Sequence, residues 1–199
     1  MRLVLFSHSS MYYGTFSLHH LVLSDVAMMR VGSPHGGEGG EPFNDQTDLS
    51  LPAMTPCLGV DVLWYADYLF NARFIYRERN SSISTVYHKT SDSSSGPLTR
   101  ESFMMQDGEK ISKVTWYAGT HLWSVDDDLI RFVTGIQFRS TAGRTSRLYG
   151  SSKGDKHSES FDGFILGHAA GRSELLLHQL QLTWINPNQS ATTTVLSSD

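Results

Sequence analysis

The chain has little of what several protein classes require. A single cysteine, Cys57, occurs among 199 residues, so no internal disulfide or cysteine-based metal site can form. No apolar run approaches the roughly 18–20 residues that a membrane-spanning helix needs, so we expect no membrane span. The N-terminal apolar stretch ends at the polar residues 7–10 and is too short for a signal peptide. Cytosolic residence or non-classical secretion is favoured, with the compartment left open.

Positive charge is also scarce. The chain carries 16 Lys and Arg against 20 Asp and Glu, a formal net charge of −4. Because nucleic-acid binders need a continuous basic surface, we expect no nucleic-acid partner. One local cluster, made of Arg139, Arg144 and Arg147, flanks a predicted turn. We interpret it as a solvated surface patch.

Motifs of known enzymes are missing. The chain has no G-x-S-x-G nucleophile elbow, no H-E-x-x-H pair, no P-loop and no dinucleotide-binding fingerprint. Its nine histidines are scattered. Residues 126–128 are three adjacent aspartates, but neighbours in a strand or turn do not converge on one ion, so we interpret them as a solvated turn. The sequence therefore predicts no catalytic residues, no metal site and no cofactor.

What the chain does have is typical of β-structure. Aromatic residues make up 11% and glycines number 17, while most of the strong helix formers are sparse. Apolar side chains alternate at Val60, Val62 and Trp64, and a second alternation runs from residue 70 to residue 76. Asp107-Gly108 is a hairpin-type turn signal. Further strand patterns lie at residues 111–117, 130–138, 161–166 and 175–184. We predict an all-β fold with Trp64 and Trp184 in its core and Cys57 as a buried, inert thiol.

The strand patterns are confined to one domain. Residues 1–31 are unpatterned and are interpreted as an N-terminal appendage, and residues 186–199 as a polar C-terminal tail. The domain between them, residues 32–185, contains a serine-rich polar insert at residues 80–100, which we expect to be a long loop. Its most unusual segment is Gly36-Gly37-Glu38-Gly39-Gly40. Glycines this dense allow positive φ angles and close backbone approach.

Read in order, several short motifs resemble one family. They are the glycine segment followed by Phe43 and Asp45; Gly108, Glu109, Ile111 and Val114; Ile136, Phe138, Gly143 and Arg144; Tyr149, Gly150 and Phe161; and Gly171, Arg172 and Ser173 before Leu182, Thr183 and Trp184. Their order and spacing resemble the jacalin-related lectins, including animal members of the zymogen granule type, over about residues 32–185.

The resemblance implies a β-prism of three four-stranded antiparallel sheets that binds a sugar at one end. One wall of that site is the glycine-rich first loop, and another is the last loop, where a glycine precedes an aspartate by four residues. A third loop tunes the specificity in animal members. Carried onto this sequence, the implied carbohydrate-binding residues are Gly36, Gly37, Gly39 and Gly40, then Ser173, Glu174, Leu175, Leu176 and His178, and Tyr117 among the third-loop candidates at residues 117–121.

The last loop departs from the family pattern. Glu174 stands where the family has glycine, and His178 stands where the family has the sugar-binding aspartate. A neutral imidazole offers one acceptor and one donor, whereas a carboxylate offers two acceptor oxygens. Glu174 is either a replacement carboxylate or a solvated loop charge. Tyr117 either stacks on a sugar ring or packs in a strand on the face opposite Trp116.

Two functions remain open at this point. The first is a lectin, not an enzyme, that binds mannose- or galactose-type glycans or glycoproteins reversibly and without metal. The alternative is a degenerate prism that serves as a protein-interaction or structural module without sugar binding, as the replacements at Glu174 and His178 suggest. Prisms of this family often pair through exposed strands, so a homo-oligomer is a further expectation, with no interface identified.

Overall fold

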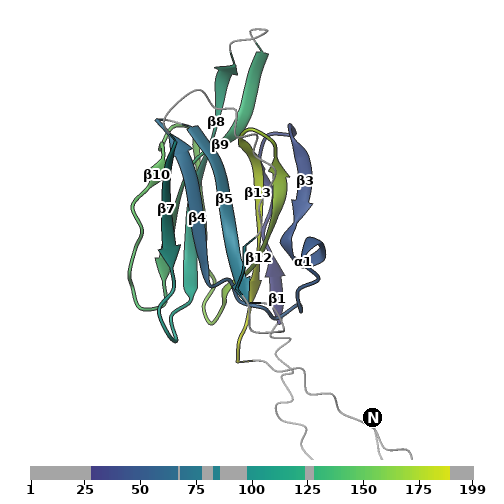
Figure 1. Ribbon diagram of the computed structural model, residues 1–199, viewed down its shortest axis with the longest axis vertical. Coiled ribbons are helices and arrows are strands. Elements are labelled where there is room, and N and C mark those ends of the chain that lie inside the picture. The colour runs from purple at the N-terminus through teal and green to yellow at the C-terminus, as the bar shows by residue number, and fades with distance from the viewer. Residues whose placement is uncertain (1–27, 67, 78–82, 86–97, 124–127, 189–199) are drawn as a thin grey trace, which may run out of the picture.

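Three antiparallel sheets enclose the core of the domain (Figure 1). The computed structural model describes residues 28–66, 68–77, 83–85, 98–123 and 128–188. Within these ranges the only helix is the single turn α1 (Asp45–Asp48), capped by the Asn44 side chain. No helix in the described part of the chain is long and apolar enough to cross a membrane. The predicted all-β prism is confirmed.

Each sheet draws on strands from separate parts of the chain. The first has the order β1 (Met29–Val31), β13 (Leu177–Ile185), β12 (Ile165–Ser173) and β3 (Glu41–Asn44), and β2 (His35–Gly36) also pairs with β13. The second has the order β10 (Tyr149–Gly150), β9 (Asp128–Ser140), β8 (Ile111–Trp123) and β11 (Asp155–Glu159). The third has the order β6 (Ile83–Thr85), β5 (Tyr68–Arg77), β4 (Gly59–Tyr65) and β7 (Thr99–Met104). The first sheet thus has five strands where four were predicted.

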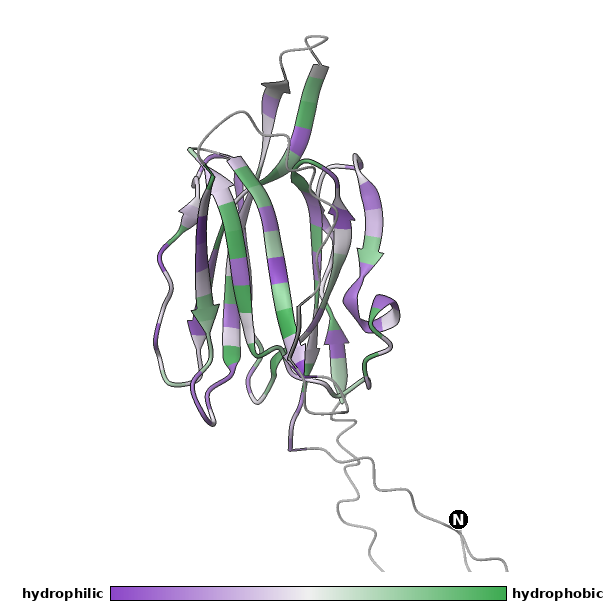
Figure 2. Cartoon of the chain, in the orientation of Figure 1, coloured by the Kyte–Doolittle hydropathy of each residue, from purple (hydrophilic) through white to green (hydrophobic). Residues whose placement is uncertain are grey.

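Side-chain alternation explains the strands of the third sheet. In β4, Val60 and Val62 are fully buried and Trp64 is 7% exposed, as the period-2 pattern predicts. In β5, Phe74 and Tyr76 continue the same inward face. Figure 2 shows apolar and polar residues alternating along these strands. Burial of the inner faces is the main driving force for closing the prism, at about 25 cal/mol for each Å² of apolar surface removed from water.

The core confirms two further predictions. Trp184 is completely buried, and so is Trp116 in the second sheet. Cys57 is also fully buried, and its burial raises the pKa of the thiol to about 12. A thiol that stays protonated at neutral pH is a poor nucleophile, so Cys57 is a packing residue.

Some boundaries differ from the prediction. Asp107-Gly108 forms a turn, with Gly108 at φ +77°, but it connects β7 in the third sheet to β8 in the second, so no hairpin forms. A local turn signal carries no information about which sheet the next strand joins. The predicted strand at residues 161–166 begins with a turn, and β12 starts only at Ile165.

The structure also differs from the prediction at the N-terminal end of the domain and in its insert. Met29–Val31 lies in the predicted appendage, yet it pairs with β13, so the first sheet starts before residue 32. Within residues 80–100, expected to be a loop, β6 and the start of β7 are strands. Most of that insert, residues 1–27 and the aspartates 126 and 127 lie outside the described residues.

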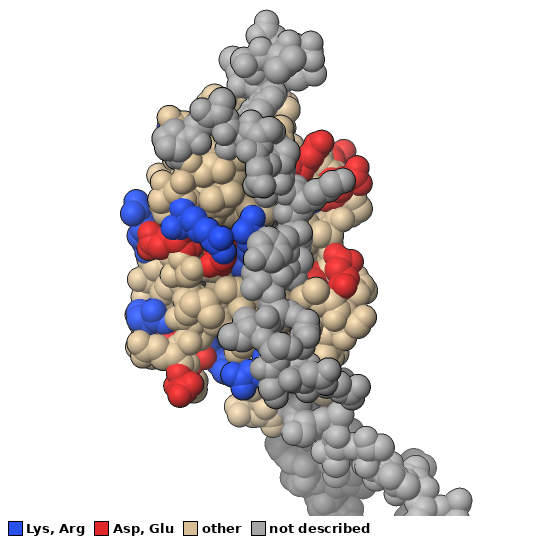
Figure 3. Space-filling model, viewed as in Figure 1, with Lys and Arg blue, Asp and Glu red and all other residues tan. Residues whose placement is uncertain are grey.

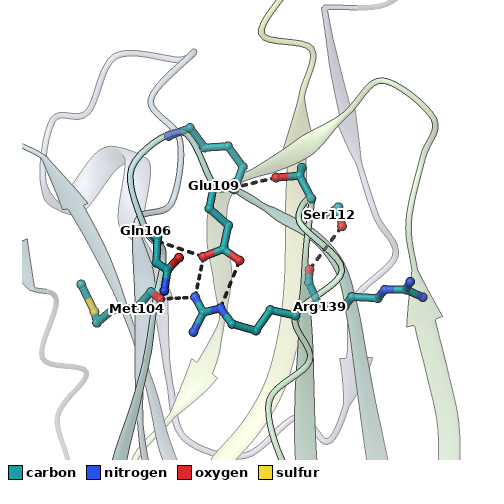
Figure 4. A network of polar contacts seen from close by, with 8 residues as sticks. Met104, Gln106, Glu109, Ser112 and Arg139 are labelled. Atoms are coloured by element: carbon teal, nitrogen blue, oxygen red, sulfur yellow. Dashed lines mark hydrogen bonds and ion pairs between the residues drawn. The ribbon is translucent and has the colours of Figure 1, made fainter.

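Arg144 and Arg147 are exposed, as the solvated-patch interpretation predicts, and both also pack against aromatic rings. The guanidinium of Arg147 lies 5.3 Å from the ring centre of Trp64. Arg144 lies 4.6 Å from the ring centre of Phe103 and donates from Nε to Oε1 of Glu109 at 3.1 Å and from a terminal nitrogen to Oε2 at 2.5 Å. This bidentate pair fixes the turn between β7 and β8 (Figure 4).

The Glu109 carboxylate makes the stability of the fold depend on pH. Its bonds from Arg144 and from the Gln106 N–H lower its pKa to about 2. In an unfolded chain a glutamate has a pKa of roughly 4.3. A carboxyl whose folded pKa is depressed stabilises the fold above the unfolded pKa and loses that contribution as pH falls toward the folded pKa.

We therefore expect the free energy of unfolding of Glu109→Gln to fall less steeply than that of the wild type between about pH 4.5 and 2. Urea unfolding followed by tryptophan fluorescence at stepped pH measures this difference. Glu101→Gln, which removes an exposed carboxylate on β7, is the matched control and should track the wild type. Parallel curves for Glu109→Gln and wild type would contradict the role given to Glu109.

Candidate functional site

The glycine segment wraps the end of the last hairpin. Strand β2 pairs with β13, and the Gly37 N–H donates to the carbonyl oxygen of His178 at 2.8 Å. On the other side, Glu41 of β3 lies opposite Ser173 of β12. The glycine loop, residues 37–40, and the β12–β13 turn, residues 174–176, are therefore side by side, although they come from opposite ends of the domain.

The first two glycines of this segment leave no room for a side chain. Gly36 has a φ of +134°, and a Cβ there would lie 2.0 Å from the carbonyl oxygen of His178. Gly37 packs equally closely on the second sheet, because a Cβ there would lie 1.9 Å from the carbonyl oxygen of Arg131 in β9. Glycine thus lets the loop close against both sheets at once. Strands β8 and β9 extend beyond the others at one end of the molecule (Figure 1).

The Arg172 side chain holds the glycine loop in place by hydrogen bonds to the carbonyl groups of the loop. Its Nε donates to the Gly39 oxygen at 3.2 Å, and a terminal nitrogen donates to the Gly40 oxygen at 2.8 Å. With the carbonyls engaged, the N–H groups of Glu38 and Gly39 donate to no other group among the residues that the structure describes. The same holds for the N–H of Leu175 in the facing turn. The two stretches therefore present backbone donors.

His178 lies beneath the glycine loop. It is 7% exposed, and a Cβ at Gly39 would lie only 2.7 Å from its Nδ1. Burial lowers the pKa of the imidazole, as does Arg172, against the opposing influence of Glu174 and of a bond with the Arg131 backbone. The ring is therefore neutral at pH 7. Its buried Nδ1 has no hydrogen-bond partner in the described part of the chain.

The remaining residues of the β12–β13 turn divide by exposure. Ser173 and Leu176 are 3% and 2% exposed, and they support the turn from inside. Glu174 is exposed and Leu175 is half-buried, so these two side chains reach the surface. The turn is closed by the Glu174 N–H, which donates to the Leu176 oxygen at 3.1 Å. Of the predicted residues on this turn, only Glu174 and Leu175 can touch a ligand without rearrangement.

Tyr117 lies away from these two stretches. It is in the middle of β8, between Gly135 of β9 and Lys156 of β11, and residues 117–121 are strand rather than the loop implied by the resemblance. It is half-buried, while Trp116 is fully buried on the opposite face, as the packing interpretation predicts. The structure does not bring Tyr117 to the glycine loop.

Arg131 of β9, which the sequence did not single out, packs against the glycine loop. Besides its carbonyl contact with Gly37, Arg131 makes an ion pair from its guanidinium to Asp155 of β11 at 2.5 Å. No sequence signal identifies Arg131, because its closeness to the glycine loop follows from how the first and second sheets pack. Within the described ranges, no three His, Cys, Asp or Glu side chains are grouped to hold a metal ion.

Comparison with known proteins places the fold. No protein-family model and no curated protein sequence matches the chain. Among solved structures, a complex of artocarpin with mannotriose matches with a TM-score of 0.65 at 19% identity, covering 79% of this chain and 98% of artocarpin. Frutapin, a lectin from Artocarpus incisa, matches with a TM-score of 0.64 at 20% identity, covering 80% and 98%. A mannose-binding jacalin-related lectin from Ananas comosus matches with a TM-score of 0.65 at 15% identity, covering 80% and 99%. The chain therefore has the β-prism fold of the jacalin-related lectins.

Proposed function

We propose that this protein is a carbohydrate-binding protein, not an enzyme, that takes a mannose- or galactose-type glycan between the glycine loop and the β12–β13 turn. Binding is reversible and uses no metal. The observation that carries the proposal is the Gly37–His178 hydrogen bond, which holds the glycine loop against the start of β13, directly after the β12–β13 turn. It is supported by similarity in fold to artocarpin, solved in complex with mannotriose, and to the mannose-binding lectin from Ananas comosus.

The chemistry of the two stretches suits a neutral sugar. Sugar hydroxyls both donate and accept, so a site needs donors and anionic acceptors. The donors are the backbone N–H groups of Glu38, Gly39 and Leu175. The acceptors are the exposed carboxylates of Glu38 and Glu174, one on each stretch. In this proposal Glu174 supplies the charge that the buried imidazole of His178 does not.

A shallow site of this kind binds weakly. A hydrogen bond to a charged acceptor contributes about 1.5–3 kcal/mol, and ordering the ligand offsets part of that gain. We expect a monosaccharide Kd on the order of 1 mM, which corresponds to about −4 kcal/mol. Glycans with several terminal sugars bind more tightly if two sites on an oligomer engage them together.

A second candidate function is favoured by the position of His178. Its ring fills the space beneath Gly39, and the residue is only 7% exposed, so no carboxylate stands at that place. A prism with this arrangement acts as a protein-interaction module, and its glycine loop serves only to close the first sheet. The two functions make different predictions for substitutions at Glu174 and His178.

The first prediction concerns Glu174. We expect Glu174→Gln to weaken binding of methyl mannoside or methyl galactoside, whichever the wild type binds, by roughly tenfold, because a charged acceptor becomes neutral. Isothermal titration calorimetry measures the change. Glu101→Gln, which removes an exposed carboxylate on β7 of the third sheet, is the matched control and should retain wild-type affinity. Equal affinities for Glu174→Gln and wild type would argue against Glu174 as the acceptor.

The second prediction concerns His178. If the wild type binds sugar, we expect His178→Ala to abolish binding, because the ring supports Gly39 and Gly40 from below. Circular dichroism and the melting temperature establish that the variant is folded. Sugar affinity that is absent from the folded wild type and appears in the double variant His178→Asp, Glu174→Gly would instead favour the interaction module. A folded wild type that binds nothing on a glycan array would reject the lectin.

A further inference from the structure

A polar groove lies at the end of the prism opposite the glycine loop. Strand β8 starts beside this groove at Ser112 and Lys113 and runs toward Thr120, which pairs with Arg131 beside the glycine loop. The groove has a volume of about 540 Å³, within the range of small-ligand sites. It lies between the start of β8, the end of β9 and the turn before β12, and it is bordered by Asn188 after β13.

Two cations line the groove as direct neighbours. Lys113 of β8 and Arg139 of β9 are register partners, so their Cβ atoms lie about 4.5–5.5 Å apart on the same face of the sheet. Like charges placed directly opposite each other destabilise a strand pair. Neither side chain makes an ion pair with any residue that the structure describes.

The nearby carboxylates do not neutralise this pair. Glu109 forms an ion pair with Arg144, and the side chain of Arg139 points away from Glu109 (Figure 4). Asp162 also lines the groove, but it is exposed and makes no ion pair of 4 Å or less with either cation. The lining thus keeps an excess of positive charge.

The outer face of the third sheet is different. Figure 3 shows Lys and Arg side chains interspersed with Asp and Glu side chains there. Arg100 pairs with Asp61, and Arg147 lies 3.8 Å from Glu101. Pairing of opposite charges is therefore the usual arrangement on that face, and the Lys113–Arg139 pair departs from it.

We propose that the groove lined by Lys113 and Arg139 is a second binding site, for a sulfate or phosphate oxyanion, either free or esterified on a larger ligand. The guanidinium binds two oxygens of such a group side by side, and the ammonium adds a point charge. The Thr141 hydroxyl accepts from the Lys110 N–H at 3.1 Å, and its own hydrogen is left to donate to the ligand. The anion relieves the repulsion between the two cations.

The net charge of the protein does not by itself favour the binding of an anion. At a net charge of −4 the chain as a whole repels anions, so binding must come from a local cluster. The site is separate from the glycine loop and does not depend on the proposed carbohydrate function. A glycan that carries a sulfate or phosphate ester is one source of the group, and free inorganic anion is another.

The test titrates the full chain with inorganic sulfate, 4-nitrophenyl sulfate and 4-nitrophenyl phosphate, followed by amide chemical shifts and calorimetry at 50 mM NaCl. We expect saturable shifts at Lys113, Arg139 and Thr141. Lys113→Gln and Arg139→Gln should each weaken binding at least fivefold, and the double variant should abolish it. Tighter binding of the aryl esters than of inorganic sulfate identifies an esterified ligand, and equal affinity identifies the free anion.

Lys156→Gln, which removes a cation on the neighbouring strand β11 outside the groove, is the matched control and should bind like the wild type. Saturating methyl mannoside should leave the anion affinity unchanged, which separates this site from the glycine loop. Unaltered affinity in the double variant, or an equal loss in Lys156→Gln, would overturn the proposal, and so would the absence of saturable shifts.

Discussion

The early strands of the domain return onto its last hairpin, and this pairing closes the prism. Strands β1, β2 and β3 all pair with β12 or β13, so the first sheet exists only once the two ends of the domain have met. The Gly37–His178 hydrogen bond fixes the point where the chain crosses this hairpin. The Trp184 indole donates to Glu159 at 2.7 Å and ties the first sheet to the second. Closing the prism and assembling the candidate site are therefore the same event.

Because the glycine loop is enclosed when the prism closes, the candidate site consists largely of backbone groups. A loop squeezed between a hairpin and a neighbouring sheet has no room for side chains at Gly36 and Gly37. Arg172 donates to the carbonyl oxygens of Gly39 and Gly40, and the N–H groups of Glu38 and Gly39 donate to no group among the described residues. His178 fills the space beneath the loop, and the exposed carboxylates of the loop and the facing turn are Glu38 and Glu174.

The sequence predicted those features that depend on neighbours along the chain. Alternation identified the inward faces of β4 and β5, and the Asp107-Gly108 turn follows from local backbone preference. The order of the glycine segment and the last hairpin indicated the prism. The structure then placed the two stretches side by side.

Features that depend on packing between sheets could not be read in the same way. Nothing local shows that β7 and β8 belong to different sheets or that Met29–Val31 is a strand, because each is decided by a partner far away in sequence. The three arginines are exposed, as predicted, but their separate contacts could not be read from the sequence: Arg144 and Arg147 pack on aromatic rings, and Arg139 lines the groove. The contact of Arg131 with the glycine loop is another such case.

The most direct test of this account is a titration of the isotopically labelled protein with methyl mannoside and methyl galactoside, observed through its backbone amides. If the early and late stretches form one site, the amides of residues 38–40 and 174–176 shift together along a single saturation curve. Shifts in only one of the two stretches, or shifts confined to another part of the prism, would contradict the account, as would a spectrum that does not change at 20-fold the expected Kd of about 1 mM.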